Sequence, residues 1–265
     1  MNEKILLVDD EKGVVTIMKK YFEMSGYQVI TAYSGQEALK KMSCLPDIVL
    51  LDINMPDMDG LTVCQSIREY ITYVKERLKE KCLLFLYVLS ENKKNININT
   101  FRRYIYLYYL SGRFFDEQMD EITISIDKGD MKIDYLEEIL DDFDMDELID
   151  IQGNQIFVLD ELRDKVNSLL SKEEKVGGNF YEIYMSIKPF VNLLSSYDEQ
   201  FIFTIFFSEP TFQEASERGI SEMNSSDSRL AQLLIDFKKQ VNNEQVDDYD
   251  ILTHWMDFVL KNYYQ

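Results

Sequence analysis

Two short apolar runs near the start of the chain each end in aspartate. The run Lys4–Val8 is followed by Asp9 and Asp10, and the run Ile48–Leu51 is followed by Asp52. Apolar runs of this length, bounded by polar residues, predict buried strands. Because the carboxyl ends of parallel strands meet at one edge of a sheet, the pattern predicts three carboxylates close together at that edge.

The segments around these strands predict a β-α-β-α-β order. The periodicity indicates helices over 13–24, 35–42 and 61–68 and a further strand over 27–32, with Pro46 breaking the chain before the third strand. This order implies a parallel sheet with right-handed crossovers. Pro56 and Gly60 are expected to let the loop turn sharply, with Gly60 free to take a positive φ and to open the last helix. Three neighbouring carboxylates repel, and a hard cation such as Mg2+ would relieve that repulsion.

Together, the segment Ile5–Asp10 and the loop LLDINMPDMDG, which ends at Gly60, resemble the receiver domain of two-component response regulators. The likeness covers residues 3–69. It implies that Asp52 is the phosphoacceptor. It also implies that Mg2+ is held by the carboxylates of Asp10 and Asp52, by the backbone carbonyl of Asn54, and by Asp9 mainly through water. The implied phosphoryl donor is a sensor histidine kinase or a phosphotransfer protein.

The resemblance stops after the third strand and its helix. A complete receiver has two more strand ends, one with a Ser or Thr and one with a Lys before Pro, and neither motif follows at the expected spacing. A stretched receiver could use 83–90 and 122–128 as those strands. Lys188–Pro189 copies the second motif but lies in a helical pattern, so we interpret it as coincidence. We favour a receiver cut short, whose central strand edge must be covered by the rest of the chain or by a partner.

The remaining chain is expected to be mostly helical, and we divide the protein into segments 1–70, 71–175 and 176–265. In the middle segment the patterns predict helices over 74–89 and 101–110, a break at 95–100, a strand over 122–126, a helix over 134–140, a hairpin over 148–159 and a helix over 160–170. This is the order of a winged helix with residues 147–159 as its wing. After a joint at Gly177 and Gly178, the last segment predicts helices over 180–197, 198–208, 228–241 and 246–263, with 208–219 as a connection and Asp227 as a helix cap.

The predicted fold class is therefore α/β, a partial flavodoxin-like receiver with a parallel sheet, joined to a mostly α domain. That second domain has a winged-helix-like part and a C-terminal helical bundle.

Charge argues against nucleic acid as a partner. The chain has a formal net charge of −20. Between Asp134 and Asp150 lie seven further Asp and Glu residues and no Arg. Phosphate contacts need cations. Lys is also missing from this stretch, so we expect a winged helix that binds protein rather than DNA, and no contact with anionic membranes.

Residues 75–265 are also somewhat similar to the middle components of bacterial ABC-three-component systems, which are associated with anti-phage defence. The likeness rests on FLYVLSEN, on FFSEPTFQEASERG with the following SSDSRL, and on the aromatic terminal helix. It implies a non-catalytic adaptor that bridges an ATPase and an effector, with the receiver fragment as a docking domain or a relic.

Two functional hypotheses follow. The first is a response regulator-like protein that accepts a phosphoryl group on Asp52 and regulates an acidic helical module, which binds other subunits through its C-terminal helices. The second is the adaptor. An enzyme is not expected, because the sequence has no glycine-rich phosphate loop and a single histidine, His254, which we assign to packing. The three cysteines form no paired motif and are expected to be core residues, and the apolar runs are too short for a signal peptide or a membrane span, which predicts a cytoplasmic protein.

Overall fold

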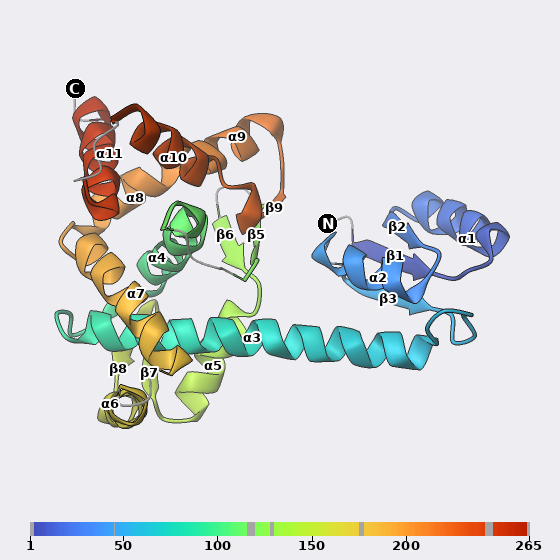
Figure 1. The fold of residues 1–265 in the computed structure, drawn as a ribbon, viewed down its shortest axis with the longest axis horizontal. Coiled ribbons are helices and arrows are strands. Elements are labelled where there is room, and N and C mark those ends of the chain that lie inside the picture. Colours follow the sequence, from blue (N-terminus) through green and yellow to red (C-terminus); the bar gives the residue numbers. More distant parts are fainter. Residues whose placement is uncertain are drawn as a thin grey trace. The chain divides into compact units, whose positions relative to one another are not determined.

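The computed structural model describes residues 3–44, 46–115, 120–127, 130–174, 178–241 and 246–263. The chain divides into two compact units, Met1–Lys75 and Glu76–Gln265, which are described separately below. Figure 1 shows the course of the chain through both units.

The first unit contains a three-stranded parallel sheet. Its strands are β1 (Lys4–Val8), β2 (Gln28–Ala32) and β3 (Ile48–Leu51), in the order β2-β1-β3. Helices α1 (Lys12–Met24) and α2 (Gly35–Lys41) connect them, and the short 3-10 helix η1 (Met42–Cys44) follows α2. The predicted β-α-β-α-β order is confirmed. Within the described residues, β3 pairs with β1 alone and is therefore an edge of this sheet.

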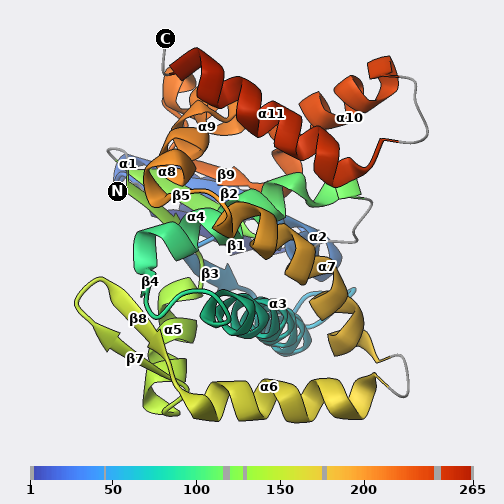
Figure 2. The same cartoon turned by 90° about the vertical axis from the view of Figure 1, so that its left-hand side faces the viewer.

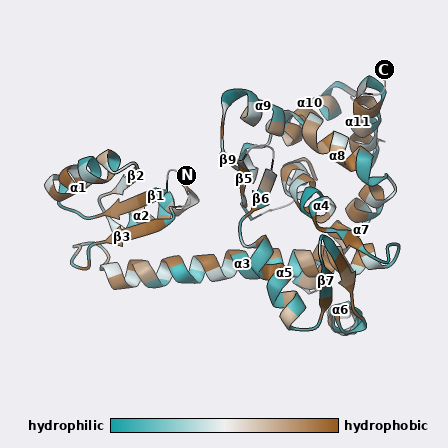
Figure 3. Ribbon diagram, turned by 180° about the vertical axis from the view of Figure 1, so that it is seen from behind, coloured by the Kyte–Doolittle hydropathy of each residue, from teal (hydrophilic) through white to brown (hydrophobic). Residues whose placement is uncertain are grey.

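The core of this unit is small. One face of the sheet packs with α2 and with the start of the helix that follows β3, which begins at Gly60. The buried residues of this core are Leu6, Val8, Ala32, Ala38, Met42, Met55, Val63 and Ile67. Strands β1 and β3 are largely apolar, as their brown colour in Figure 3 shows. Helix α1 leaves Ile17, Tyr21 and Met24 on the surface, and Met24 is 89% exposed.

Helix α3 (Gly60–Ser90) is longer than the sequence pattern indicated. Leu78, Cys82, Phe85 and Leu89, spaced three and four residues apart, are all buried, as expected on one face of a helix. The predicted helices over 61–68 and 74–89 are parts of this continuous element. The stretched-receiver alternative, which required a strand over 83–90, is wrong because these residues lie in α3.

The second unit begins within α3 and contains two further three-stranded sheets. The first has the order β4-β8-β7 and is antiparallel; the second has the order β6-β5-β9. The elements that follow α3 are β4 (Ile96–Asn97), α4 (Ile98–Ser111), η2 (Gly112–Phe115), β5 (Thr123–Asp127), β6 (Asp130–Ile133), α5 (Leu136–Met145), β7 (Ile149–Gln152), β8 (Gln155–Val158) and α6 (Asp160–Glu173). The predicted hairpin over 148–159 is confirmed, and Gly153 takes a φ of 62° in its turn.

The last part of this unit contains five helices among the described residues. They are α7 (Asn179–Ser195), α8 (Glu199–Ser208), α9 (Pro210–Arg218), α10 (Arg229–Val241) and α11 (Asp248–Tyr263), with β9 (Glu222–Asn224) and η3 (Ser225–Asp227) before α10. In Figure 2, α11 and α10 lie side by side, and α6 runs below the end-on view of α3. Gly177 of the predicted joint lies outside the described residues.

Several expectations for this region are wrong. The connection 208–219 contains α9, because Pro210 favours the first turn of a helix and the Glu209 side chain accepts the Thr211 and Phe212 N–H groups. Ser228, rather than Asp227, caps α10, since its Oγ accepts the Ala231 N–H at 3.1 Å. His254 is exposed rather than packed. The expectation that all three cysteines are core residues is also wrong: Cys82 is buried, but in the first unit Cys64 is only partly buried and Cys44 is exposed.

One continuous core joins the middle and last parts of the second unit. Aromatic side chains of α4 pack against α7 and α8, with Tyr106 against Phe206 and Tyr108 against Phe190. The Glu209 carboxylate is fully buried and accepts hydrogen bonds from the Tyr106 hydroxyl and from the Thr211 and Phe212 N–H groups. Burial raises the pKa of Glu209, although these donors act in the opposite direction.

Candidate metal site at the carboxyl edge of the parallel sheet

The two neighbouring strands β1 and β3 place the aspartates that follow them. Their register pairs Val8 with Leu51, so the next residue of each strand lies at the same edge of the sheet. The backbone continues the ladder there, because the Asp52 N–H donates to the Val8 carbonyl at 2.8 Å and the Asp9 N–H donates to the Ala32 carbonyl at 3.2 Å. The positions of these residues are therefore set by sheet hydrogen bonds.

The three predicted carboxylates come together at this edge. One carboxylate oxygen each from Asp9, Asp10 and Asp52 lies within 4.8 Å of the others. Asp9 and Asp52 are half-buried and Asp10 is exposed, and the Asp9 Oδ1 accepts the Glu11 N–H at 2.7 Å. Three negative groups at this separation repel one another, and an all-oxygen donor set suits a hard divalent cation. The donor set therefore fits Mg2+.

Asn54 lies two residues beyond Asp52 and is exposed in the loop. A role for its backbone carbonyl as a metal ligand stays a prediction. Met55, next to it, is buried in the core of the first unit and anchors the loop to the sheet.

Gly60 closes this loop through a close backbone approach, and not through the positive φ that the sequence suggested. A Cβ on Gly60 would lie 2.2 Å from the Asp52 carbonyl oxygen, so no other residue fits without movement. The Gly60 N–H donates to the Ile53 carbonyl at 3.0 Å. Asp59 then caps α3 by accepting the Thr62 N–H at 3.0 Å and the Thr62 hydroxyl at 2.8 Å, and these bonds lower the pKa of Asp59.

Both lysines that the sequence offered as candidates belong to the second unit. Lys128 lies outside the described residues. Lys188 lies in α7 of the second unit, where its Nζ donates to the Tyr184 hydroxyl at 2.6 Å, so the helical interpretation of Lys188–Pro189 is confirmed. The first unit therefore supplies the three carboxylates of a receiver site from the ends of its own strands.

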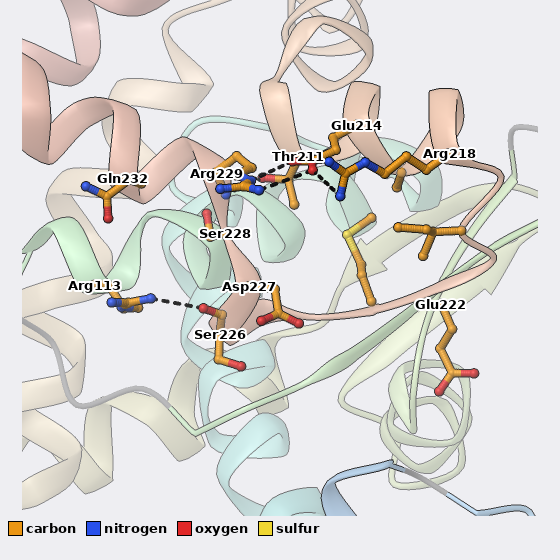
Figure 4. A pocket seen from close by; sticks show the side chains of 13 residues that line it. Arg113, Thr211, Glu214, Arg218, Glu222, Ser226, Asp227, Ser228, Arg229 and Gln232 are labelled. Carbon is orange, nitrogen blue, oxygen red and sulfur yellow. Dashed lines mark hydrogen bonds and ion pairs between the residues drawn. The ribbon is translucent and has the colours of Figure 1, made fainter.

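A polar hollow lies in the second unit, between α9 and α10. It has a volume of about 490 Å³ and is shown in Figure 4. Glu214 accepts from Arg229 at 2.5 Å and from Arg218 at 2.7 Å, and Arg113 donates to the Ser226 carbonyl at 3.0 Å. Because its charged groups pair with one another, and Asp227 and Glu222 also line it, the hollow favours neither sign of ligand charge.

Comparison with known proteins identifies the first unit. Residues 5–75 match the family model of the response regulator receiver domain. The alkaline phosphatase synthesis transcriptional regulatory protein PhoP of Bacillus subtilis is 50% identical over 70 residues, which are 26% of this chain and 29% of that protein. The response regulator SaeR of Staphylococcus epidermidis is 46% identical over 65 residues, or 24% of this chain and 28% of that protein. Residues 5–75 are therefore receiver-domain sequence, as the residues themselves predicted.

Two solved structures are similar to part of the chain. The response regulator protein TrrA from Thermotoga maritima, in complex with Mg2+-BeF, is 42% identical over 26% of this chain and 60% of that chain, with a TM-score of 0.25. Vibrio cholerae chemotaxis protein CheY4 is 32% identical over 28% of this chain and 62% of that chain, with a TM-score of 0.27.

The match is confined to a small part of the curated relatives. The chain spans less than a third of the length of PhoP and of SaeR. The comparisons give no support to the adaptor alternative. No helix among the described residues is long and apolar enough to cross a membrane.

Proposed function

We propose that this protein is a response regulator-like signalling protein that accepts a phosphoryl group on Asp52 and thereby regulates its second unit. The observation that carries the proposal is the convergence of Asp9, Asp10 and Asp52 at one edge of a parallel sheet, within receiver-domain sequence. A sensor histidine kinase or a phosphotransfer protein would supply the phosphoryl group.

The chemistry assigned to Asp52 is nucleophilic attack. Its half-buried carboxylate oxygen forms a bond to phosphorus as the donor's leaving group departs, which produces an aspartyl phosphate. Asp10, Asp52 and the Asn54 carbonyl would hold Mg2+, with Asp9 acting mainly through water. The bound ion would offset negative charge on the phosphoryl oxygens. The modified side chain carries roughly −1.5 to −2 charges, which changes the electrostatics of the loop that Gly60 closes.

The second unit is proposed as an output module that binds protein. Its elements α3, β4, α4, α5, β7 and β8, with the sheet order β4-β8-β7, support the winged-helix-like domain that we propose over residues 71–175. Where such a domain would contact DNA, α5 carries Glu137, Glu138, Asp141, Asp142 and Asp144 and no basic residue. An acidic helix repels phosphates, so a protein partner is the better fit.

The test is Mg2+-dependent phosphorylation of the purified full chain by acetyl phosphate, read by intact mass. We expect the mass of one added phosphoryl group, lost in Asp52→Asn and when Mg2+ is chelated. Asp57→Asn, which removes an exposed carboxylate from the same loop, is the matched control and should leave the modification in place. A folded wild-type chain that takes up no phosphoryl group from acetyl phosphate or from a phosphorylated histidine kinase would contradict the proposal.

A further inference from the structure

An apolar groove runs between α10 and α11 at the end of the second unit. It has a volume of about 790 Å³, and its lining is mainly apolar. Helix α10 contributes Leu233 and Phe237, four residues apart, and α11 contributes Trp255 and Phe258, three residues apart. The fully buried Leu234 closes the floor.

Three of the apolar side chains that line the groove are exposed. Phe258 is 64% exposed, Phe237 is 44% exposed, and Leu233 is exposed beside them. Single exposed apolar residues are ordinary, but a contiguous set lining one groove marks an interaction site. Anchors spaced three and four residues apart on two adjacent helices suit the apolar face of a third helix laid across them.

The polar rim of the groove is already compensated. Arg229 is held by Glu214 at 2.5 Å, and Asp236 pairs with Lys239 at 3.7 Å. The sign of the partner's charge is therefore set by the field of the whole unit rather than by the rim. Residues 76–265 contain 20 Lys and Arg against 37 Asp and Glu, so the unit as a whole is strongly negative.

This field selects among the possible occupants. A second copy would bring another net charge of −20 to the contact, and an anionic membrane would be repelled in the same way. We propose that the groove between α10 and α11 binds an amphipathic helix of a partner protein, with apolar anchors on one face and Lys and Arg on the other. This names the partner chemistry of the output module, and in that sense it rests on the proposed function.

The groove carries its own optical reporter, because Trp255 is the only tryptophan of the chain. The probe is a synthetic, tryptophan-free helical peptide with Leu and Phe on one face and Lys and Arg on the other. Two matched peptides serve as comparisons: one with Glu in place of Lys and Arg, and one with the same composition but scrambled so that no apolar face forms. Binding is followed by Trp255 emission and by fluorescence polarisation of the labelled peptide.

We expect the basic amphipathic peptide to shift Trp255 emission to shorter wavelength and to saturate. The acidic peptide should bind at least about tenfold more weakly at low salt. Phe258→Ala should weaken the basic peptide by about tenfold or more, as is usual for a central aromatic anchor. Phe203→Ala is the matched control, because Phe203 on α8 is 41% exposed but lies outside the groove.

Several outcomes would overturn the inference. These are equal binding of the scrambled peptide, equal binding of the acidic peptide, or no binding in a chain whose folding is verified. A dimer of the chain alone that Phe258→Ala dissociates would assign the groove to a second copy. The experiment uses unphosphorylated protein, so failure here is distinguishable from failure of phosphorylation.

Discussion

The two units of this molecule divide packing and chemistry unequally. Among the residues that the structure describes, the main core cluster of the first unit contains eight buried apolar residues, whereas that of the second contains fifty. Among the described residues, the carboxylate cluster lies in the first unit alone. Hydrophobic burial is the dominant favourable term in folding, so the first unit should be the less stable of the two. The candidate site is thus carried by a three-stranded sheet with a small core beneath it.

The second unit shows the opposite arrangement. Its buried carboxylate, Glu209, is enclosed by hydrogen-bond donors and lies inside a continuous core, where it has a structural role. A partly exposed aspartate at the end of a strand can exchange ligands, whereas a glutamate with no exposed surface cannot. Trp255 reports unfolding of the second unit, and hydrogen exchange along β1 and β3 reports the first, so the comparison can be tested unit by unit.

The largest effect is expected from Glu209→Ala. This change removes the cap of α9 and leaves the buried Tyr106 hydroxyl without its acceptor, which together should cost about 3 kcal/mol of unfolding free energy. Urea unfolding followed by Trp255 fluorescence measures it. Glu217→Ala, an exposed glutamate of the same helix, should change the stability by less than about 0.5 kcal/mol. Similar values for both variants would show that Glu209 does not anchor the core.

The next largest effect concerns Gly60→Ala. A Cβ 2.2 Å from the Asp52 carbonyl oxygen forces the loop to move, which we expect to destabilise the first unit by about 2 kcal/mol. Faster hydrogen exchange in β1 and β3 is the measurement, and the Trp255 transition should not change. Gly13→Ala is the control, because a Cβ there meets nothing within 4 Å in α1 and alanine favours a helix. Equal protection in both variants would refute the close approach.

A smaller effect is expected from Mg2+. At ten times its dissociation constant, the ion should stabilise the first unit by about 1.4 kcal/mol through mass action and should leave the second unit unchanged. Slower hydrogen exchange at the carboxyl ends of β1 and β3 on titration is the readout. Asp10→Asn should remove the response, whereas Asp59→Asn should retain it because Asn also caps helices and Asp59 is outside the cluster. Stabilisation of both units alike would indicate non-specific binding.

The smallest expected effect is on the pH dependence of the free energy of unfolding. Burial raises the folded-state pKa of Glu209 above 4.5, so the folded protein binds more protons than the unfolded chain between these two values. The contribution of Glu209 is therefore full below about pH 4.5 and decreases as pH rises through the folded-state pKa. Urea unfolding by Trp255 fluorescence at several pH values should show a flatter profile for Glu209→Gln. A steeper dependence of the unfolding free energy on pH in Glu209→Gln would contradict a raised pKa of Glu209 in the folded protein.

The sequence alone predicted the first unit well because its information is local. A strand that ends in aspartate brings its carboxylate to the sheet edge whatever surrounds it, so Asp9, Asp10 and Asp52 were found from spacing. The hairpin over 148–159 was equally local, because Gly153 marks the turn between its strands. The close approach of Gly60 to the Asp52 carbonyl oxygen was not predicted, because the position of a glycine in the sequence does not show which backbone atom lies next to it.

Only the tertiary structure decided the features that depend on distant residues. Strand β9 exists because Glu222–Asn224 pairs with β5, about a hundred positions earlier in the chain, and no pattern in three residues announces that partner. The burial of Glu209 and the exposure of His254 likewise depend on which helices pack against them. The sequence thus determined the receiver strands and their carboxylates, because periodicity and spacing act over a few residues. The groove between α10 and α11 could be seen only in the tertiary structure, because it is formed by residues of two separate segments that pack together.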